Sequence, residues 1–568
     1  MYPAAILLAL VLPFGAIQPL LTTPWLSMTD DKLVLLLTAL TWLLQGRRAL
    51  PTAAEWRALV PSLGVLVVAV AAALQAPVFV EEALKSVWRL GVAAFALLLV
   101  LRVGRQPGHL YGLLWALVIG AGASACLGLG EAWGWPIFGP ALALFKVAPT
   151  RVGADLRVSA TFQYATIASM YFEMLTPVAL VLAATARRRW QQLLGLAIAG
   201  VCTASVVLSL TRAGLVTLAL VFAALLAYAG LRSGRRLLAP TLAACGVLVG
   251  GVAILAVRDP VFDMRLVSES DADWYAAAYS APATLRFDPD PSVRIALDVR
   301  NDGRIVWSSS AESLHPFALG YRWLTADGTG VLDLPPGEVP LPHDIRPGET
   351  IHLEALVGAS HLPPGTYRLA WGMLQRDVVQ FYERGSHDAE SVVTLGQAAT
   401  RGDVPLPAIS PRDDGEAPWV VGRLQLWGAA LRLAESRPLF GVGPDNFRHL
   451  YGAELGLETW DERVQANNVY LELLADTGVL GLAAFGWLIL PPIVEALRVL
   501  RARMPTPTSY WLLGCGLGVL AFLVHGVLDS FLAFTPTALL FWMLLAMILN
   551  LCPMASAGST QKPHVSGR

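Results

Sequence analysis

The residues best suited to chemistry stand in three polar stretches that border long apolar runs. The first, Ser209–Gly214, places Arg212 in a very short turn between two such runs. A charged side chain at the centre of a bilayer costs about 2.5–3.5 kcal/mol on insertion scales, so this arginine needs a reason. A snorkelling arginine without a function is one interpretation. We favour a functional role, because the orientation predicted below puts the turn on the membrane side where arginine is disfavoured.

The second stretch begins at Arg423, in the segment Val420–Leu433. Its apolar residues recur at helical spacing, which predicts an amphipathic helix at the membrane interface. The Gly/Pro-rich turn Pro438–Phe447 follows. Within it, Gly441 and Gly443 would let backbone amides approach a bound anion.

The third stretch, Gln465–Gly481, leads polar residues such as Asn467 and Asn468 into an apolar run. Near the end of the next run, His525 and Asp529 are spaced i, i+4, so a helix would place them on one face. Two interpretations of this pair stay open. The two side chains either pair with each other structurally or line a substrate cavity.

The composition indicates which elements must position these residues. The chain has 568 residues, of which 55% are hydrophobic and 15% charged, and its mean hydropathy is +0.57. These values predict a polytopic membrane protein. A net charge of -1 argues against nucleic acid as a partner. The five cysteines show no CxxC spacing, and Asp30–Asp31 and Asp288–Asp290 are interpreted as a helix start and a turn, so we expect no metal site.

Apolar runs of roughly the length that crosses a bilayer, about 17–25 residues, recur at both ends of the chain. We predict about twelve spans, at 3–21, 31–46, 58–76, 87–103, 109–129, 165–185, 191–209, 212–230, 237–256, 473–497, 509–527 and 533–552.

Basic residues fix the expected orientation of these spans. Every even-numbered span is followed by arginines, at Arg47, Arg48, Arg57, Arg102, Arg105, Arg187, Arg188, Arg189, Arg232, Arg235, Arg236, Arg498, Arg501 and Arg503. By the positive-inside rule these exits and both termini are cytoplasmic. The long polar interval after the ninth span is then extracytoplasmic.

That interval, Val257–Trp419, changes to short alternating apolar runs with many Pro and Gly turns. Strands are predicted at Val293–Val299, Gly320–Leu324, Thr350–Ala355 and Thr366–Trp371, as in a small antiparallel sandwich. The pattern also resembles an immunoglobulin-like module appended to bacterial cell-surface glycan proteins. Its aromatic residues either fill the sandwich core, which we favour, or bind sugar by stacking; they are Trp307, Trp323, Trp371, Phe381 and Tyr382.

The segments RLQLWGAALRL, PLFGVGPDNF and NNVYLELLADTGVLGL, taken together, resemble the O-antigen ligase and polymerase superfamily. The turn SLTRAG and the upstream RVSATFQY also match family segments, and the resemblance covers roughly residues 150–255 and 419–550. It implies a GT-C-like inverting membrane glycosyltransferase whose donor is a polyprenyl-diphosphate-linked glycan. No metal or other cofactor is implied.

The resemblance also implies roles for individual residues. Arg212 and Arg423, with Arg157 as a third candidate, would bind the diphosphate through bidentate hydrogen bonds and stabilise the leaving group. Asn467 would orient the acceptor hydroxyl. Further substrate-binding candidates are Tyr164, Gly441, Gly443, Asn446, Asn468, His449 and His525.

One position departs from the family pattern. Ligases usually carry a proposed catalytic histidine where this chain has Asn467, and an asparagine cannot take a proton near neutral pH. His449, Asp461 or Glu462 could replace it. The departure favours a polymerase over a ligase.

The predicted organisation is a membrane domain (1–256), an extracytoplasmic loop with a β-sandwich at about 283–396 (257–418), an amphipathic helix and catalytic loop (419–472), three final spans (473–552) and a cytoplasmic tail (553–568). We expect a bacterial cytoplasmic-membrane protein. Its expected partners are the lipid bilayer, the lipid-linked donor, a glycan or lipid-glycan acceptor and other cell-envelope synthesis proteins. The alternative functions are a flippase of lipid-linked glycan, although no internal repeat is evident, and a non-catalytic glycan-binding membrane protein.

Overall fold

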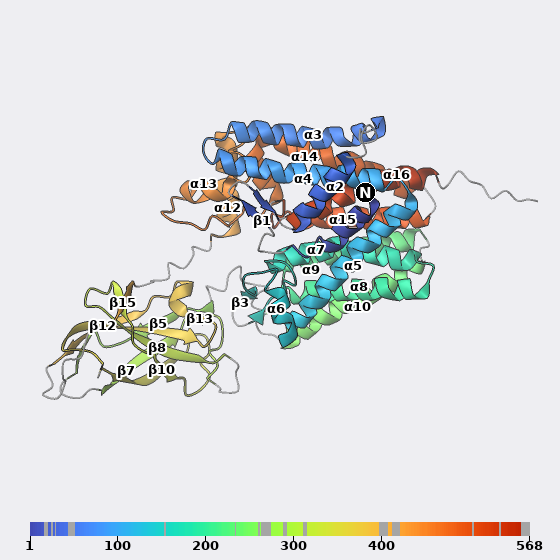
Figure 1. The fold of residues 1–568 in the computed structure, drawn as a ribbon. Coiled ribbons are helices and arrows are strands. Elements are labelled where there is room, and N and C mark those ends of the chain that lie inside the picture. Colours follow the sequence, from blue (N-terminus) through green and yellow to red (C-terminus); the bar gives the residue numbers. More distant parts are fainter. Residues whose placement is uncertain are drawn as a thin grey trace, which may run out of the picture. The chain divides into compact units, whose positions relative to one another are not determined.

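A computed structural model gives the fold, and two compact units make up the chain. One unit is helical and combines Met1–Thr150, Leu156–Pro260 and Gly422–Arg568; the other is a β unit formed by Val261–Val421 with Arg151–Asp155 (Figure 1). The structure describes residues 1–15, 21–23, 26–28, 30–43, 52–152, 155–232, 235–258, 262, 274–287, 292–309, 315–359, 361–396, 407–411, 421–502, 505–532 and 535–557. Arg47, Arg48, Arg503 and the predicted turn at 288–290 lie outside these residues.

The helical unit contains a helix at each of the twelve predicted spans. These are α1 (Tyr2–Val11), α2 (Asp30–Leu43), α3 (Ala53–Leu74), α4 (Val80–Val103), α5 (Pro107–Ala132), α7 (Ala165–Thr185), α8 (Arg189–Leu208), α9 (Arg212–Leu231), α10 (Arg235–Arg258), α14 (Val469–Ala502), α15 (Pro507–His525) and α16 (Thr535–Ala557). Two further helices, α12 (Arg423–Ser436) and α13 (Phe447–Glu454), precede α14, and the short α6 (Gly139–Leu142) follows α5.

Fewer than twelve of these helices qualify as membrane spans. Among the described residues, nine are long and apolar enough to cross a membrane, namely α4, α5, α7, α8, α9, α10, α14, α15 and α16. Helix α1 has 10 residues and α2 has 14, and the apolar part of α3 begins only at Ala58. The expected count of about twelve spans is therefore not supported, because the first three runs yield short or partly polar helices.

Local sequence explains where several helices begin. The backbone N–H of Thr52 donates to Glu55 at 2.7 Å and the Thr52 hydroxyl accepts from the Glu55 N–H, which forms a capping box at α3. At α15, the Thr506 hydroxyl caps the helix and Pro507 occupies its first position. These caps satisfy amides that have no partner within the helix.

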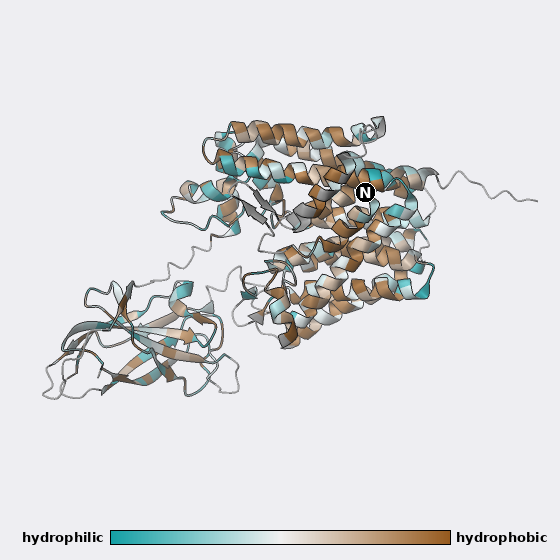
Figure 2. Cartoon of the chain, viewed as in Figure 1, coloured by the Kyte–Doolittle hydropathy of each residue, from teal (hydrophilic) through white to brown (hydrophobic). Residues whose placement is uncertain are grey.

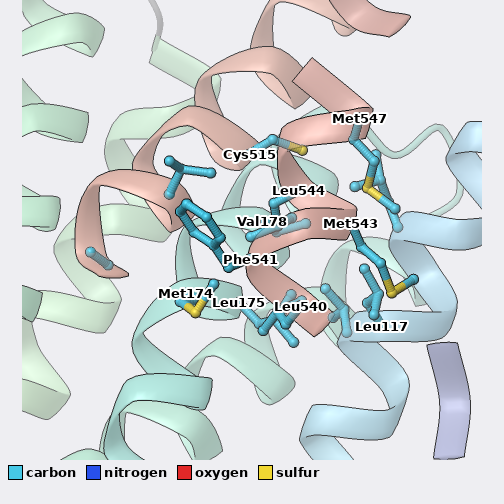
Figure 3. Close-up of a cluster of buried hydrophobic side chains, with 14 of the residues drawn as sticks. Leu117, Met174, Leu175, Val178, Cys515, Leu540, Phe541, Met543, Leu544 and Met547 are labelled. Carbon is cyan, nitrogen blue, oxygen red and sulfur yellow. The ribbon is translucent and has the colours of Figure 1, made fainter. Parts of the chain in front are cut away.

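The core of the helical unit lies between α5, α7, α15 and α16. Leu117, Met174, Val178, Cys515 and Phe541 are completely or nearly completely buried there (Figure 3). Figure 2 shows that hydrophobic residues dominate the helices, and many of them are exposed, among them Val67, Leu220 and Val249. Exposed apolar side chains all along the helices are what a bilayer requires.

Two contacts join basic helix ends to the ends of other helices. Arg105, at the end of α4, pairs with Glu55 at the start of α3, with 2.8 Å between Nη2 and Oε1. Arg232, after α9, donates to the backbone carbonyl of Arg501 at the end of α14. Arg232 follows α9 and Arg501 is near the end of α14, so the beginnings of these two helices, next to Arg212 and Asn467, lie at their opposite ends.

The β unit contains two main sheets. The larger has eight strands, in the order β15 (Ile409–Pro411), β9 (Gly330–Leu332), β8 (Phe317–Leu324), β12 (Gly365–Gln375), β14 (Ala389–Leu395) and β6 (Thr284–Phe287), with β10 (Gly337–Pro340) on β8 and β13 (Val379–Gln380) on β12. The smaller has the order β11 (Thr350–Gly358), β7 (Ser292–Asn301) and β5 (Ala277–Ser280). Strands β7, β8, β11 and β12 are the four that the sequence predicted.

Two expectations about this unit need correction or completion. The sheets are not wholly antiparallel, because β14 and β6 pair in parallel, and an immunoglobulin-like arrangement is not supported. Most of the aromatic residues fill the core of the unit, as we favoured: Trp307, Trp371 and Phe381 are fully buried and Trp323 is 3% exposed. Tyr382 is the exception, being half-buried.

Candidate active site

Arg157 binds the turn that carries Arg212. Its Nε donates to the carbonyl of Ser209 at 2.9 Å and its Nη2 to the hydroxyl of Thr211 at 3.2 Å. The turn is tight, with Leu210 in the left-handed region at φ 52°. Since two of the Arg157 donors are engaged in this way and its residue is only 9% exposed, we assign it to shaping the turn. Arg212, at the first position of α9, is half-buried.

A buried ion pair holds the segment of Arg157. Lys146 pairs with Glu131 at the end of α5 and donates to the hydroxyl of Ser159 at 2.9 Å. The other oxygen of Glu131 accepts from the backbone N–H of Ala160 at 3.0 Å. Burial lowers the pKa of Lys146 despite its acidic partner. The ion pair and its hydrogen bonds fix residues 159–160, directly after Arg157.

The beginning of α9 packs closely on a buried acid in α7. A Cβ added at Gly214 would lie 2.6 Å from Oε1 of Glu173, so only glycine permits this approach. Glu173 accepts hydrogen bonds from Ser169 at 2.5 Å and from Nδ1 of His525 at 2.9 Å, and the side chains of Glu173 and His525 are fully buried. His525 thus connects the Arg212 helix with the end of α15.

The predicted pairing of His525 and Asp529 is present, with 3.5 Å between Nε2 and Oδ2. Sequence analysis missed Glu173 as the second acidic partner. The signal that could have found it is a charged residue inside the apolar run 165–185, which is as costly there as Arg212 is in its turn.

The loop 438–443 replaces two hydrogen bonds that α14 lacks. The helix breaks at Gly478, where φ is 66° and ψ is −169°. The amides of Val442 and Gly443 donate to the carbonyls of Ala475 and Asp476, both at 2.9 Å. In return, the amides of Val479 and Leu480 donate to the carbonyls of Pro438 and Leu439 at 2.8 and 3.3 Å.

This exchange changes the interpretation of the two loop glycines. Gly441 has φ 67° and Gly443 φ 108°, and a Cβ at Gly441 would lie 2.4 Å from the carbonyl oxygen of Ala475. The amide of Gly441 donates to Arg437 and that of Gly443 to Asp476, each at 2.9 Å. In this conformation both amides therefore donate to backbone carbonyls, and their contact with an anion stays a prediction. Glycine is required here for close approach to α14.

A charged cluster follows the two glycines. The carboxylate of Asp445 accepts from Arg89 of α4 at 2.8 Å and from Arg448 at 3.2 Å, and its side chain is 5% exposed. The carboxylate of Asp476 accepts from the backbone N–H groups of Asp445 at 2.7 Å and Phe447 at 2.9 Å. Arg89 was missed by sequence analysis, although an arginine inside the apolar helix α4 carries the same signal as Arg212.

Asn446 and His449 attach this loop to the connection between α3 and α4. The Asn446 amide donates to the carbonyls of Val78 and Val442 at 2.9 and 3.0 Å. His449 stacks on Phe79 with 4.6 Å between ring centroids, and its Nδ1 lies 3.0 Å from Oε2 of Glu462. Of the three residues that could replace the family histidine, two are thus hydrogen-bonded to each other.

Asp461, the third residue that could replace the family histidine, is bound to an arginine. Both of its oxygens accept from the Arg463 guanidinium at 2.9 Å, and this contact lowers the pKa of the carboxyl group. Tyr164, at the N-cap of α7, is 38% exposed and lies within electrostatic range of Arg463. Tyr164 is therefore accessible, whereas Asp461 is committed to a local ion pair.

Asn467 and Asn468 differ sharply. Asn468 caps α14 by accepting from the amides of Tyr470 and Leu471, both at 3.0 Å. Asn467 is half-buried in the left-handed region at φ 50°, and among the described residues its side chain has no hydrogen-bond partner. The amide of Val469 donates to the carbonyl of Gly526 at 2.8 Å, which places this segment beside the end of α15. Asn467 is thus available to a ligand, and Asn468 is structural.

Arg423 stands on a separate element. It is the first residue of α12, which packs on α14 and α13, and it is half-buried. Its Nε has no hydrogen-bond partner among the residues that the structure describes. The groups around Arg212, around Asp445 and around Asn467 are connected through α7, α14 and α15, at the helix ends opposite the basic ones. Within the described part of the chain, no three His, Cys, Asp or Glu side chains are grouped to hold a metal ion.

Comparison with known proteins agrees with this geometry. A family described as O-antigen ligase matches residues 371–486, which run from within β12 through the rest of the β unit to α12, the loop 438–447, α13 and the first half of α14. No curated protein matches the chain. The family match supports a membrane glycosyltransferase-like protein with lipid-linked glycan substrates. Together with the sequence motifs, it supports the assignment of this chain to the O-antigen ligase and polymerase superfamily.

Proposed function

We propose that this protein is an inverting glycosyltransferase that transfers or polymerises polyprenyl-diphosphate-linked glycan at the outer face of the bacterial cytoplasmic membrane. The observation that carries the proposal is the gathering of the Arg212 turn, the loop 438–447 and Asn467 at one end of the helical unit. The basic helix ends, which include Arg105 and Arg232, lie at the other end and would face the cytoplasm.

Arg212 and Arg423 bind the donor diphosphate in this proposal. Each stands at the first position of a helix, so the positive end of the helix dipole adds to its charge. A guanidinium forms paired hydrogen bonds with phosphate oxygens and stabilises the charge that develops as the diphosphate leaves. Arg157 acts as a positioning residue, because it holds the turn of Arg212 through Ser209 and Thr211.

Asn467 orients the acceptor hydroxyl, whose oxygen attacks the anomeric carbon as the bond to the diphosphate breaks. The proton of the hydroxyl needs an acceptor that an amide cannot provide. The His449–Glu462 pair supplies it: Glu462 is 55% exposed and its carboxylate is held by the imidazole at 3.0 Å. A positioned proton acceptor contributes roughly 10²–10⁴-fold to such reactions.

Transfer from a polyprenyl-diphosphate oligosaccharide, measured with purified protein in liposomes and with EDTA present, tests the proposal. Loss of either donor arginine, in Arg212→Ala or Arg423→Ala, should reduce transfer by roughly 10²–10³-fold, the usual effect of removing one transition-state donor. Each variant has a matched control on its own helix. These controls, Arg232→Ala and Arg432→Ala, should retain transfer.

Two further variants address the proton acceptor. Glu462→Gln should reduce transfer, whereas Asp461→Asn should leave it nearly unchanged, because Asp461 is bound to Arg463. Asn467→His should restore a ligase-like base, since histidine is also tolerated at positive φ. Donor flipping without transfer by the wild type would favour a flippase, and donor binding with neither activity would favour a non-catalytic glycan-binding protein.

A further inference from the structure

A cavity lies within the β unit, on the face of the larger sheet that points away from the aromatic core. Its volume is about 330 Å³, within the range of roughly 300–1,000 Å³ that is typical of ligand sites. The strands β8 and β12 form its floor, and the segments 331–336 and 380–388 form its walls. Apart from Tyr321, whose ring contacts Trp371 on the core face, the residues that line it on the two strands alternate with core residues such as Leu319 and Trp323.

The hollow exists because two glycines face each other across the strands. Gly320 of β8 and Gly372 of β12 are direct partners in the register, so no side chain rises from the centre of the floor. A Cβ at Gly372 would lie 2.3 Å from Oδ1 of Asp388. The missing side chain therefore makes room for this carboxylate above the sheet.

The cavity contains a partly buried ion pair on this otherwise bare floor. Nη2 of Arg322 donates to Oδ2 of Asp388 at 2.9 Å, and the two side chains are 19% and 4% exposed. The guanidinium lies over the ring of Tyr382, with 3.9 Å from Cζ to the ring centroid. Asp333, Gln380 and Ser410 add further polar groups to the lining.

These groups have the chemistry of a sugar site. An adjacent guanidinium and carboxylate can donate to one hydroxyl of a vicinal pair and accept from the other. The ring of Tyr382 offers apolar surface to the C–H face of a sugar ring. With two carboxylates, from Asp333 and Asp388, against the one guanidinium of Arg322, the lining disfavours an anionic ligand.

We propose that this cavity binds a neutral saccharide unit of the glycan on which the protein acts. The proposal rests on the proposed function for the origin of the glycan, and it assigns the β unit a binding site separate from the transfer site. The aromatic residues first considered for sugar stacking are in the core, apart from Tyr382, so recognition depends on the ion pair and one ring.

Saturation-transfer NMR on the full-length protein in nanodiscs tests the cavity directly. The probes are the methyl glycosides of glucose, galactose, mannose, rhamnose and N-acetylglucosamine, with glucuronic acid as the anionic comparison. Alkyl glycoside detergents must be avoided throughout, since their headgroups are sugars and would compete. At least one neutral glycoside should bind to the wild type, more strongly than glucuronic acid.

The variant Arg322→Gln/Asp388→Asn removes both charges together, so no buried charge is left unpaired. It should weaken saccharide binding by about ten-fold or more, as expected for lost hydrogen bonds to charged groups. Tyr382→Ala should weaken binding without touching the ion pair. The matched control is Arg368→Gln/Glu390→Gln, a second Arg–carboxylate pair on β12 and β14 that does not line the cavity.

The outcomes separate this proposal from the proposed function. Binding that is unchanged in both cavity variants, absent from the wild type, or stronger for glucuronic acid overturns the saccharide site. Transfer of a donor glycan can be measured on the same preparations. If the protein transfers glycan but the cavity binds no saccharide, only the proposed binding site in the β unit is rejected. If the cavity binds saccharide but no glycan is transferred, only the proposed glycosyltransferase function is rejected.

Discussion

The helical unit contains deeply buried ion pairs, whereas most of the described ion pairs of the β unit are at least partly exposed to water. In the helical unit, His525 and Glu173 form a pair in which both side chains are 0% exposed, and Lys146 and Glu131 are nearly as deeply buried. In the β unit, Arg294 and Glu354 are 79% and 62% exposed. A surface pair contributes little to stability, whereas a charge buried away from water persists only with a close partner. Burial therefore distinguishes charged residues that mark a site from those that keep a surface soluble.

Arg322 and Asp388 are the informative exception in the β unit. Their exposed fractions of 19% and 4% are closer to those of the buried pairs in the helical unit than to the 38% and 27% of Arg368 and Glu390 on the same sheet. Burial of a charged pair, the property that singles out Glu173 and His525 in the helical unit, thus also singles out the cavity in the β unit. Substitutions of four ion pairs or acceptors that differ in burial can test this criterion.

The largest effect is expected at His525. His525→Ala leaves Glu173 buried without its imidazole partner, which should destabilise the helical unit by about 3–5 kcal/mol. The measurement is the apparent unfolding midpoint of the protein in nanodiscs. Replacing both residues in His525→Leu/Glu173→Met should recover most of the loss, and an unchanged midpoint for His525→Ala would show that the pair is not needed for stability.

A smaller effect is expected at Arg322. Arg322→Ala removes the partner of a carboxylate that is 4% exposed, which should cost roughly 1.5–3 kcal/mol in the β unit. Arg368→Ala, which breaks a pair with exposed fractions of 38% and 27%, should cost no more than about 1 kcal/mol. Limited proteolysis of the β unit in denaturant compares the two. Equal losses would contradict the burial criterion.

Asp476 should show a local effect. In Asp476→Asn, one of the two oxygens that accept from Asp445 and Phe447 is replaced by an amide nitrogen, at a cost of about 1 kcal/mol. Hydrogen exchange at the amides of Asp445 and Phe447 should accelerate about five-fold, while exchange in the β unit stays constant. Protection that is unchanged at both amides would mean that the carboxylate does not hold the loop.

The smallest effect is expected for Arg294 and Glu354. A double-mutant cycle with Arg294→Ala and Glu354→Ala should give a coupling energy below about 0.5 kcal/mol, because both side chains are largely in water. Denaturant unfolding followed by tryptophan fluorescence provides the measurement. A coupling above 2 kcal/mol, roughly that of a partly buried pair, would remove the distinction between the two kinds of ion pair.

Sequence predicted the helices and the strands well, because their signals are local. Apolar length located all twelve helices, and alternation between turn residues located β7, β8, β11 and β12. The number of membrane spans was harder to predict, since α1 and α2 are apolar but short. The parallel pairing of β6 with β14 joins strands that are more than 100 residues apart, and no local pattern encodes it.

The candidate site was only partly predictable. Arg212 was singled out because a charge beside apolar runs is costly, and the same rule, applied inside the spans, also finds Glu173 and Arg89, whereas Asn467 was singled out by the resemblance to the family. The roles of Arg157, Gly441 and Gly443 could not be predicted, because they depend on which carbonyls lie opposite them. Arg157 binds Ser209 across 52 residues, and the two glycines meet a break in α14 that only the folded chain reveals.

The break at Gly478 couples the stability of α14 to that of the loop 438–443. The four hydrogen bonds between them replace the two that a continuous helix would form at Val479 and Leu480. Without the loop, two carbonyls and two amides would lose their partners; Ala475 and Asp476, which carry the carbonyls, are buried, and an unpartnered buried group costs roughly 1–3 kcal/mol. A chain that lacks the loop would therefore leave these backbone groups of α14 without partners around Gly478, and it should be less stable than the full chain although Arg212, Arg423 and Asn467 are still present.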